Sequence, residues 1–362
     1  MLTNVEFGKQ DFLNDESHFE QSKHIKSLLI KGDESSEPFI SIAIPTYRRA
    51  NLLKEAIDSC LAQENFTDFN IVVTDNDPIR GNETEILMET YQSDRILYYK
   101  NEVNIGALAN FNRCIEMSTG KYAIMLNTDD LLAKDYLRNI SGLLIRYPEA
   151  DMVFPNIDIE INGKIKRQKA YQSLMRKLSK VINLNQTAIR LNINDFILYG
   201  PAGSPSGVVY RREVFLKSPG FNPKWHPTGD KILYICFSLK NQVYLTNINA
   251  GRYRFLDNIT QESGMRTHFI SQGMHINRYL AERLNKKWVN RYYKGATYYR
   301  LNRPSDRKYG ITLDKEAINT LFETPPNIVD FMFFSLIWVI ALMKWSLRVL
   351  VAAFGTYIRG AK

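Results

Sequence analysis

Two adjacent carboxylates, Asp129 and Asp130, follow an apolar run at residues 122–126. Acidic side chains at the end of a buried strand are costly unless water or a cation compensates them. Mg²⁺ and Mn²⁺ prefer carboxylate oxygens and keep coordination positions open for phosphate. A cation there would bridge a nucleotide diphosphate and stabilise the charge that develops on a leaving group. The alternative is a helix cap, because Thr128, Asp129 and Asp130 precede Leu131.

Asp75 holds a comparable position at the end of the apolar run 69–74. A carboxylate there can accept hydrogen bonds from the edge of a base or from a ribose hydroxyl. The sequence Asp75–Asn76–Asp77–Pro78 is also strong turn chemistry, so on these residues alone a simple turn is the better interpretation.

Alternating strands and helices must position these side chains. The strand patterns cover residues 39–45, 69–74, 95–100 and 122–126, and the helical patterns between them cover 52–61, 82–92 and 107–118. This alternation predicts an α/β fold with a mainly parallel sheet flanked by helices. Ligands bind beyond the carboxyl ends of such strands, which is where both acidic clusters stand.

The second half of the chain is less regular than the first. We expect a strand and edge hairpin at 151–163, a loop at 200–207, a helix at 229–239, strands at 242–254 and one long helix at 274–299. The predicted organisation is a loosely packed leader at 1–38, the α/β domain at 39–260, a helical extension at 261–326 and an apolar membrane-associating tail at 327–362.

Four stretches carry a resemblance to a known family: SIAIPTYRRANLLKEAIDSCLAQ (41–63), FNIVVTDND (69–77), NIGALANFNRCIEMSTGKYAIMLNTDD (104–130) and GFNPKWHPTGDKILYICFSLK (220–240). In order and spacing they resemble the family 2 glycosyltransferases of the GT-A fold, over roughly residues 39–257. The resemblance implies an inverting transferase that needs Mn²⁺ or Mg²⁺ and takes a sugar from a nucleotide-sugar donor, with UDP as the expected nucleotide.

The resemblance also assigns roles to individual residues. It places Pro45, Thr46 and Tyr47 along the nucleotide pocket, Arg49 at the phosphates, Asp75 at the uracil, and Asn104 and Gly106 over the nucleotide. Asn110 and Arg113 follow on the next helix, and the resemblance implies that one of them, taken as Arg113, faces the site. Asp130 becomes the direct metal ligand, and Asp129 contacts the ribose or sugar and supports the metal site.

The implied catalytic base is Asp230, which follows Gly229 where the family usually has Glu-Asp. The alternative for Asp230 is a helix cap. No histidine follows Tyr253–Arg254, where many relatives complete the metal shell, so the candidates there are Asp257, His226 and His268, with Arg254 as a diphosphate ligand. The Gln-x-x-Arg-Trp signature of processive synthases is absent, which predicts one sugar per acceptor.

Charge and cysteine usage bear on location and partners. The net charge is +9, with a basic run at 164–180, and this excess favours polyanions or an anionic membrane. No nucleic-acid-binding module accompanies it, so we expect no nucleic-acid partner. Three separated cysteines and a polar N-terminus without a secretory pattern predict a cytoplasmic protein.

The tail contains a continuous apolar run at 331–343, followed by Lys344 and Arg348. About 20 residues are needed to cross a bilayer, so this pattern predicts a helix on or dipping into the inner face of the cell membrane. The alternative is a core or oligomer-forming helix. A membrane location suits a polyprenyl-diphosphate-linked saccharide acceptor, as in bacterial O-antigen or capsule synthesis.

Two other functions compete with glycosyl transfer. A nucleotidyltransferase would share the need for metal and nucleotide, but the first strand has no Gly-rich basic loop of the pyrophosphorylase type. A catalytically silent scaffold of a polysaccharide assembly complex would tolerate Gly229 in place of an acidic residue. Turnover of a nucleotide sugar separates this scaffold from an enzyme.

Overall fold

The structure is a computed structural model that describes residues 17–161, 163–166, 188–199, 205–226, 228–256, 263–286, 288–302 and 324–360, with single residues 316, 319 and 322. The chain divides into two compact units. One contains the described residues from 17 to 193 and from 205 to 256, and is called the sheet unit. The other contains residues 194–199 and the described residues from 263 to 351, and is called the helical unit.

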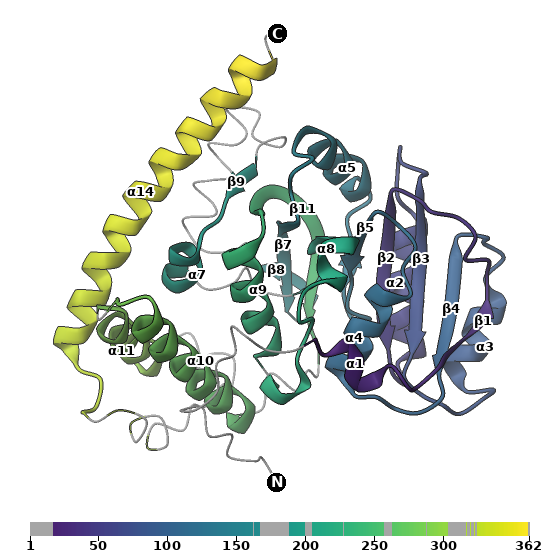
Figure 1. Cartoon of the computed structure of the whole chain (residues 1–362), viewed down its shortest axis with the longest axis horizontal. Helices are drawn as coiled ribbons and strands as arrows, with labels where there is room; N and C mark the ends of the chain where they lie inside the picture. Colours follow the sequence, from purple (N-terminus) through teal and green to yellow (C-terminus); the bar gives the residue numbers. More distant parts are fainter. Residues whose placement is uncertain are drawn as a thin grey trace. The chain divides into compact units, whose positions relative to one another are not determined.

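The sheet unit is built on a mixed sheet in the order β1-β4-β3-β2-β5-β10-β7-β11-β6 (Figure 1). Its parallel strands are β4 (Ile96–Asn101), β3 (Phe69–Asp75), β2 (Ile40–Thr46) and β5 (Tyr122–Met125). Beyond β5 lie β10 (Val209–Arg211), β7 (Met152–Ile161), β11 (Val243–Phe255) and β6 (Leu131–Leu132), while β8 (Lys164–Lys166) pairs with β7 and β9 (Ala188–Arg190) with β11. β10 is antiparallel to both of its neighbours, and β11 is parallel to β7.

Helices cover both faces of the parallel strands. They are α2 (Ala50–Leu61), α3 (Glu83–Thr90), α4 (Ala107–Glu116) and α5 (Tyr136–Arg146), and the second half adds α8 (Arg212–Leu216) and α9 (Gly229–Lys240). Alternate strand residues such as Ile42 and Ile71 pack in one core cluster with side chains of α2, α3 and α5. The strands are therefore apolar on both sides, which explains their continuous apolar runs.

The N-terminal segment departs from the expected loose leader. Within it, α1 (Phe19–Ser22) is followed by β1 (Ser27–Lys31), which pairs antiparallel with β4 and so belongs to the sheet. The guanidinium of Arg113 holds this segment through the carbonyls of Ser22 and Ile25, at 2.7 Å and 2.9 Å. β1 covers an edge of β4 that would otherwise expose unpaired backbone groups. Residues 1–16 lie outside the described part of the chain.

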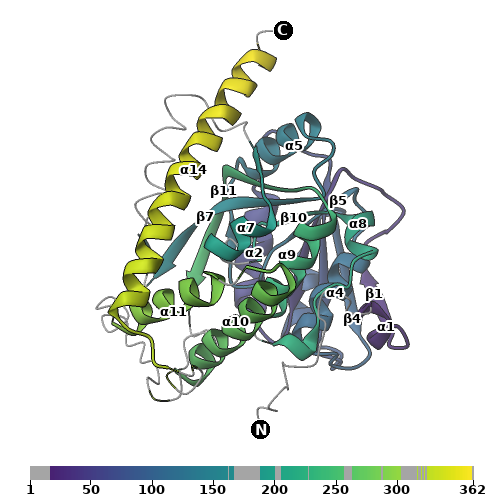
Figure 2. The ribbon, with the colours of Figure 1, turned by 60° about the vertical axis from the view of Figure 1, so that its left-hand side comes forward.

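The helical unit contains α7 (Ile193–Tyr199), α10 (Ser263–Arg283), α11 (Trp288–Leu301) and the first part of α14 (Ile328–Gly360). The predicted continuous helix at 274–299 is two helices, because the chain turns between α10 and α11. α11 and α14 lie side by side (Figure 2), with the rings of Tyr292 and Phe334 5.0 Å apart. The predicted boundary between extension and tail at residue 326 therefore does not separate two domains: both belong to one unit.

α14 continues as one helix through Lys344 and Arg348. The guanidinium of Arg348 is paired with Asp195 at 2.6 Å, and Ala341 and Trp345 are buried. By length and composition alone, the stretch Ile328–Arg348 is long and apolar enough to cross a bilayer, and 17% of it is buried inside the protein. One side of α14 thus packs against the protein, and another side is apolar and exposed.

Candidate active site at the carboxyl edge of the sheet

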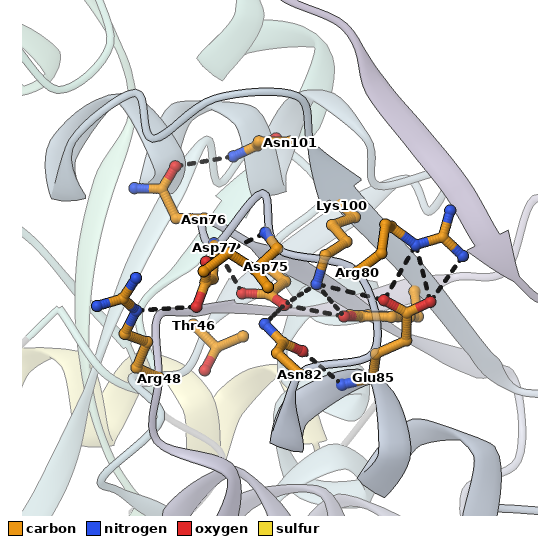
Figure 3. Close-up of polar contacts among 12 residues, drawn as sticks. Thr46, Arg48, Asp75, Asn76, Asp77, Arg80, Asn82, Glu85, Lys100 and Asn101 are labelled. Carbon is orange, nitrogen blue, oxygen red and sulfur yellow. Dashed lines mark hydrogen bonds and ion pairs between the residues drawn. The ribbon is translucent and has the colours of Figure 1, made fainter.

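Asp75 ends β3 with no exposed surface. One carboxylate oxygen accepts hydrogen bonds from the Tyr98 hydroxyl and from Lys100 Nζ, both at 2.9 Å, and from Asn82 Nδ2 at 3.3 Å. The other oxygen accepts the backbone N–H of Asp77 at 2.9 Å. Figure 3 shows these groups converging on the end of the strand. The negative charge of Asp75 is thus compensated inside the protein.

Lys100 also connects this cluster to the surface. Its ammonium lies 3.5 Å from Glu85, and Glu85 is paired at 2.7 Å with the exposed guanidinium of Arg80 (Figure 3). The hydrogen bond from Arg80 lowers the pKa of Glu85 despite its burial. The four charges alternate in sign, so the buried pair at Asp75 and Lys100 is electrostatically balanced.

An amide network joins β3 to the segment that precedes α4. Asn76 donates to Asn104 at 2.8 Å and accepts from Asn101 Nδ2 and from the backbone N–H of Ile105, at 3.0 Å and 2.9 Å. Gly106 then caps α4 with a φ of 84°, a conformation that glycine adopts without strain. The predicted pair Asn104 and Gly106 is therefore held directly against the end of β3.

Asn110 completes this network from α4. Its amide donates to the carbonyl of Thr74 at 3.0 Å and accepts from Asn101 at 2.9 Å. Asn110 is buried, so it fixes α4 to the strand ends. The sequence pointed to Asn110 but gave no sign of Asn101, because an amide that acts only through tertiary contacts has no local signature.

The loop after β2 carries Tyr47, Arg48 and Arg49 across this edge. Arg48 donates from Nε to Asp77 at 2.8 Å, and its guanidinium lies 5.0 Å from the Tyr47 ring centroid. Arg49 Nη1 lies 3.2 Å from a carboxylate oxygen of Asp129. Two successive arginines are therefore anchored to the ends of two different strands. Arg48 was not singled out by the sequence analysis.

The first two residues of the predicted nucleotide pocket lie at the end of β2. The Pro45 carbonyl accepts the hydroxyl of Thr128 at 2.7 Å, which ties β2 to the acidic turn after β5. The Thr46 hydroxyl is buried and makes no hydrogen bond. A buried hydroxyl without a partner is uncommon, and here it faces the same edge as Asp75 and Asp77 (Figure 3).

Asp129 and Asp130 form the acidic turn. Asp130 is fully buried: one oxygen accepts the backbone N–H of Arg254 at 2.9 Å, and the other accepts the Ser206 hydroxyl and, at 3.3 Å, Asn127 Nδ2. Burial and the charge of Asp129 raise the pKa of Asp130 to about 7. Arg254 also donates to the Asp129 carbonyl and pairs with Glu55, so its guanidinium is committed to the turn.

The donor set fits a hard divalent cation. Two neighbouring carboxylates, whose burial and mutual repulsion raise the pKa of Asp130, are stabilised when a cation lies between or beside them. Within the described residues no group of three Asp, Glu, His or Cys side chains forms a closed metal site. Mg²⁺ and Mn²⁺ commonly take only one or two carboxylates and complete their shell with phosphate and water.

Asp230 lies in the first turn of α9 and is partly buried. Desolvation raises the pKa of its carboxyl group to about 6, although the backbone N–H of Lys231 donates to it at 2.7 Å. The preceding Gly229 is fully enclosed: a Cβ there would lie 2.7 Å from Leu108 Cδ1 and 3.1 Å from the Asn222 carbonyl oxygen. The acidic residue that the family usually has at this position would require the Leu108 side chain and the Asn222 carbonyl to move.

Arg113 does not face the site. Its guanidinium donates to the N-terminal segment described above and to Glu116 at 2.9 Å, and the side chain is buried. Its four hydrogen-bond partners, with Ser27 the fourth, engage all three nitrogens of the guanidinium, so we leave Arg113 out of the nucleotide pocket. The prediction was wrong because a helical position does not reveal which neighbour covers it.

The alternatives for the third metal ligand belong to different parts of the chain. His226 is exposed, and His268 belongs to α10 of the helical unit, where Gln272 lies 3.1 Å from its ring nitrogen. Asp257, most of the basic run 164–180 and most of the loop 200–207 lie outside the described residues.

Comparisons with known proteins agree with this geometry. Residues 41–217 match the family model described as Glycosyl transferase family 2. Abequosyltransferase RfbV of Salmonella typhimurium is 36% identical over 102 residues, which are 27% of this chain and 30% of that protein. The putative colanic acid biosynthesis glycosyl transferase WcaA of Escherichia coli is 30% identical over 95 residues, 26% of this chain and 34% of that protein. The matched segments are thus about a third of these relatives.

A solved structure of S. aureus TarS 1-349 in complex with UDP resembles most of the chain. Its TM-score is 0.56 at 16% identity, and the match covers 89% of this chain and 91% of that chain. At this identity the likeness concerns the fold. It confirms the α/β GT-A fold that the sequence predicted.

Proposed function

We propose that the chain is a member of glycosyl transferase family 2, whose model matches residues 41–217, and that it transfers one sugar from a UDP-sugar to a saccharide acceptor with inversion at the anomeric carbon. The observation that carries this proposal is the contact between Arg49 and Asp129 at 3.2 Å. It joins the loop after β2, which would hold the nucleotide, to the acidic turn after β5, which would hold a cation. Both halves of a donor site therefore lie at one edge of the sheet.

Asp230 is the proposed general base. Its carboxylate takes the proton of an acceptor hydroxyl while the hydroxyl oxygen bonds to the anomeric carbon and the bond from that carbon to the diphosphate breaks. A pKa of about 6 leaves the group ionised near neutral pH and makes it a stronger base than an ordinary aspartate. UDP leaves with the electron pair of the broken bond.

Asp130 and Asp129 are the residues that would hold Mn²⁺ or Mg²⁺. The cation, when bound, supplies positive charge that stabilises the departing diphosphate. Arg49 is placed to add a second positive charge if Asp129 exchanges it for the cation. Pro45, Thr46, Tyr47, Asp75, Asn104 and Gly106 remain the proposed lining of the nucleotide pocket.

The relatives support a class of donor and a class of acceptor. The TarS structure contains UDP, which supports a UDP-sugar here. The names of RfbV and WcaA concern abequosyl transfer and colanic acid synthesis, which support a role in bacterial surface polysaccharide synthesis. A polyprenyl-diphosphate-linked saccharide is the acceptor class that suits such a pathway.

The location that we propose is the inner face of the cell membrane. The outer side of α14 exposes a row of apolar side chains: Val329, Met332, Leu336, Val339, Ile340, Met343, Leu347, Leu350 and Val351. Their spacing of three or four residues places most of them on one side of the helix. The net charge of +9 adds attraction to anionic lipids. A homo-oligomer that buries the same row is the alternative.

The proposal is tested by screening UDP-sugars for release of UDP in the presence of Mn²⁺ and a lipid-linked acceptor. Activity of the wild type that is lost in Asp230→Asn supports it. A folded protein that binds UDP but turns over no donor in such a panel would favour the second candidate, a silent scaffold. The missing acid at Gly229 is the observation behind that candidate.

A further inference from the structure

Arg48 has an unusual backbone conformation at the edge of the proposed donor site. Its φ is 54°, in the left-handed region that residues with a side chain seldom adopt. Such a conformation is unfavourable for a residue with a Cβ and persists only where surrounding contacts hold it. Two contacts do so here: the hydrogen bond to Asp77 and the stacking on Tyr47.

The ion pair between Arg48 and Asp77 is asymmetric. The Asp77 side chain is 4% exposed, while that of Arg48 is 57% exposed (Figure 3). Burial raises the pKa of Asp77, but hydrogen bonds from Arg48, Ile79 and Asn82 hold it below its ordinary value. Asp77 is therefore an ionised carboxylate beneath the surface, and one of its partners is a solvated side chain.

Asp75, by contrast, has no such replaceable partner. Its compensating charge is Lys100, whose side chain is 3% exposed and which also contacts Glu85. A ligand that replaced Lys100 on Asp75 would leave the buried Lys100 ammonium with one partner fewer, which is costly. Of the two acids at the end of β3, only Asp77 can change partners at low cost.

A second observation points to a ligand at this place. The Thr46 hydroxyl is 3% exposed and makes no hydrogen bond, and it ends the strand next to β3. Thr46 pairs in register with Asp75, two residues before Asp77. A nucleoside seated here would give this hydroxyl a partner from its own polar groups.

We propose that Arg48 and Asp77 form an exchangeable ion pair in the donor site: a hydrogen-bond donor of the nucleoside replaces Arg48 on Asp77, and the released guanidinium binds the diphosphate. This inference rests on the proposed function, since it assigns two residues to the donor of that reaction. Arg48 then leaves the contacts that hold its left-handed conformation. Asp77 becomes a nucleoside ligand, and Arg48 a diphosphate ligand that discriminates UDP from uridine.

Binding of uridine and of UDP to the full chain tests the exchange, by calorimetry with Mn²⁺ present. Arg48→Gly removes the guanidinium and accepts the positive φ. It should bind uridine up to about fivefold more tightly, because no ion pair has to be broken. The same variant should bind UDP about tenfold more weakly, because a charge-assisted hydrogen bond is lost. Arg48→Ala should likewise bind uridine more tightly and UDP more weakly than the wild type.

Two more variants complete the set. Asp77→Asn should weaken uridine binding about tenfold, because an amide replaces the charged acceptor. Lys54→Ala is the matched control: it removes one positive charge from the exposed side of α2 and should leave the affinities for uridine and UDP unchanged. Circular dichroism melts establish that each variant is folded.

The opposite response of the two ligands to loss of Arg48 is the deciding result. Equal weakening of uridine and UDP in both Arg48 variants, or unchanged uridine binding in folded Asp77→Asn, would overturn the exchange. Wild-type protein that binds no UDP would instead refute the proposed function. The two failures are therefore distinguishable in the same experiment.

Discussion

Lys100 Nζ lies 2.9 Å from a carboxylate oxygen of Asp75, and both side chains are almost completely buried. Their positions at the ends of neighbouring parallel strands β4 and β3 make the pair a fixed support beneath the proposed nucleotide loop. The pair is in register, Asp75 opposite Lys100, so the sheet itself brings the charges together. Its role can be separated from catalysis by measuring stability.

Lys100→Met should lower the free energy of unfolding by about 3–5 kcal/mol, because it leaves the Asp75 charge buried without its main partner. The double variant Lys100→Met with Asp75→Asn should recover part of that loss. Urea unfolding followed by circular dichroism measures both. A single variant as stable as the wild type would show that the pair does not support the fold.

Asp130→Ala should abolish sugar transfer, and Asp129→Ala should weaken it strongly. The physical reason is the loss of carboxylate oxygens for the divalent cation that stabilises the leaving diphosphate. Rates at increasing Mn²⁺, with and without excess chelator, check the expectation. Asn139→Ala, on exposed polar surface, is a control that should leave activity intact. Full wild-type activity in excess chelator would rule out the metal role.

Asp230→Asn should reduce turnover by about 10²–10⁴-fold while leaving UDP affinity nearly unchanged, since a general base acts in the chemical step. Single-turnover rates and UDP titration separate the two quantities. Parallel loss of binding and rate would mean that Asp230 shapes the pocket. Unchanged turnover would remove it from the mechanism.

The activity should fall below a pH of about 6 at saturating metal. The base must be ionised, and burial raises the pKa of Asp230 from 3.8 to about 6, so the acid limb should lie above that of an ordinary aspartate. A raised folded-state pKa also means that the ionised group opposes folding, and this penalty is present above pH 6. Asp230→Asn should therefore stabilise the fold at pH 8 but not at pH 3, as thermal melts would reveal.

The tail is best tested by substitution. Leu336→Glu with Met343→Glu should release the protein from anionic liposomes, because two exposed apolar contacts become charged. Pelleting at low and high salt measures the apolar and ionic contributions separately. Deletion of α14 is a poorer test, since Trp345 and Ala341 are buried in the helical unit. Equal pelleting of wild type and variant would place the membrane contact elsewhere, and a change of oligomeric state would favour the helix-pairing alternative.

The strands and helices around the proposed site could be predicted closely from the sequence. β2 and β3 are buried on both faces, so they appear as uninterrupted apolar runs, and their expected ends lie within one residue of Thr46 and Asp75. β1 was missed because none of its residues is buried, and only pairing with β4 makes it a strand. The local sequence pattern does not reveal a neighbouring strand that is remote in the sequence.

The residues of the candidate site divide in the same way, into those that could be predicted from the sequence and those that only the folded structure shows. Position at a strand end, together with the family resemblance, selected Asp75, Asp129 and Asp130 from the sequence. Their partners could not be predicted, because Lys100 reaches Asp75, and Ser206 reaches Asp130, only in the folded structure. Arg113 was misplaced for the same reason, since the N-terminal segment that holds it is 86 to 91 residues away.

The enclosure of Gly229 has a consequence for how this sequence can change. Any side chain at that position meets the Asn222 carbonyl, which belongs to the backbone, and Leu108, which is a movable side chain. A larger residue at 229 therefore has to displace the Leu108 side chain and shift the backbone at Asn222, so the effect of a substitution at 229 depends on the residues at these two places.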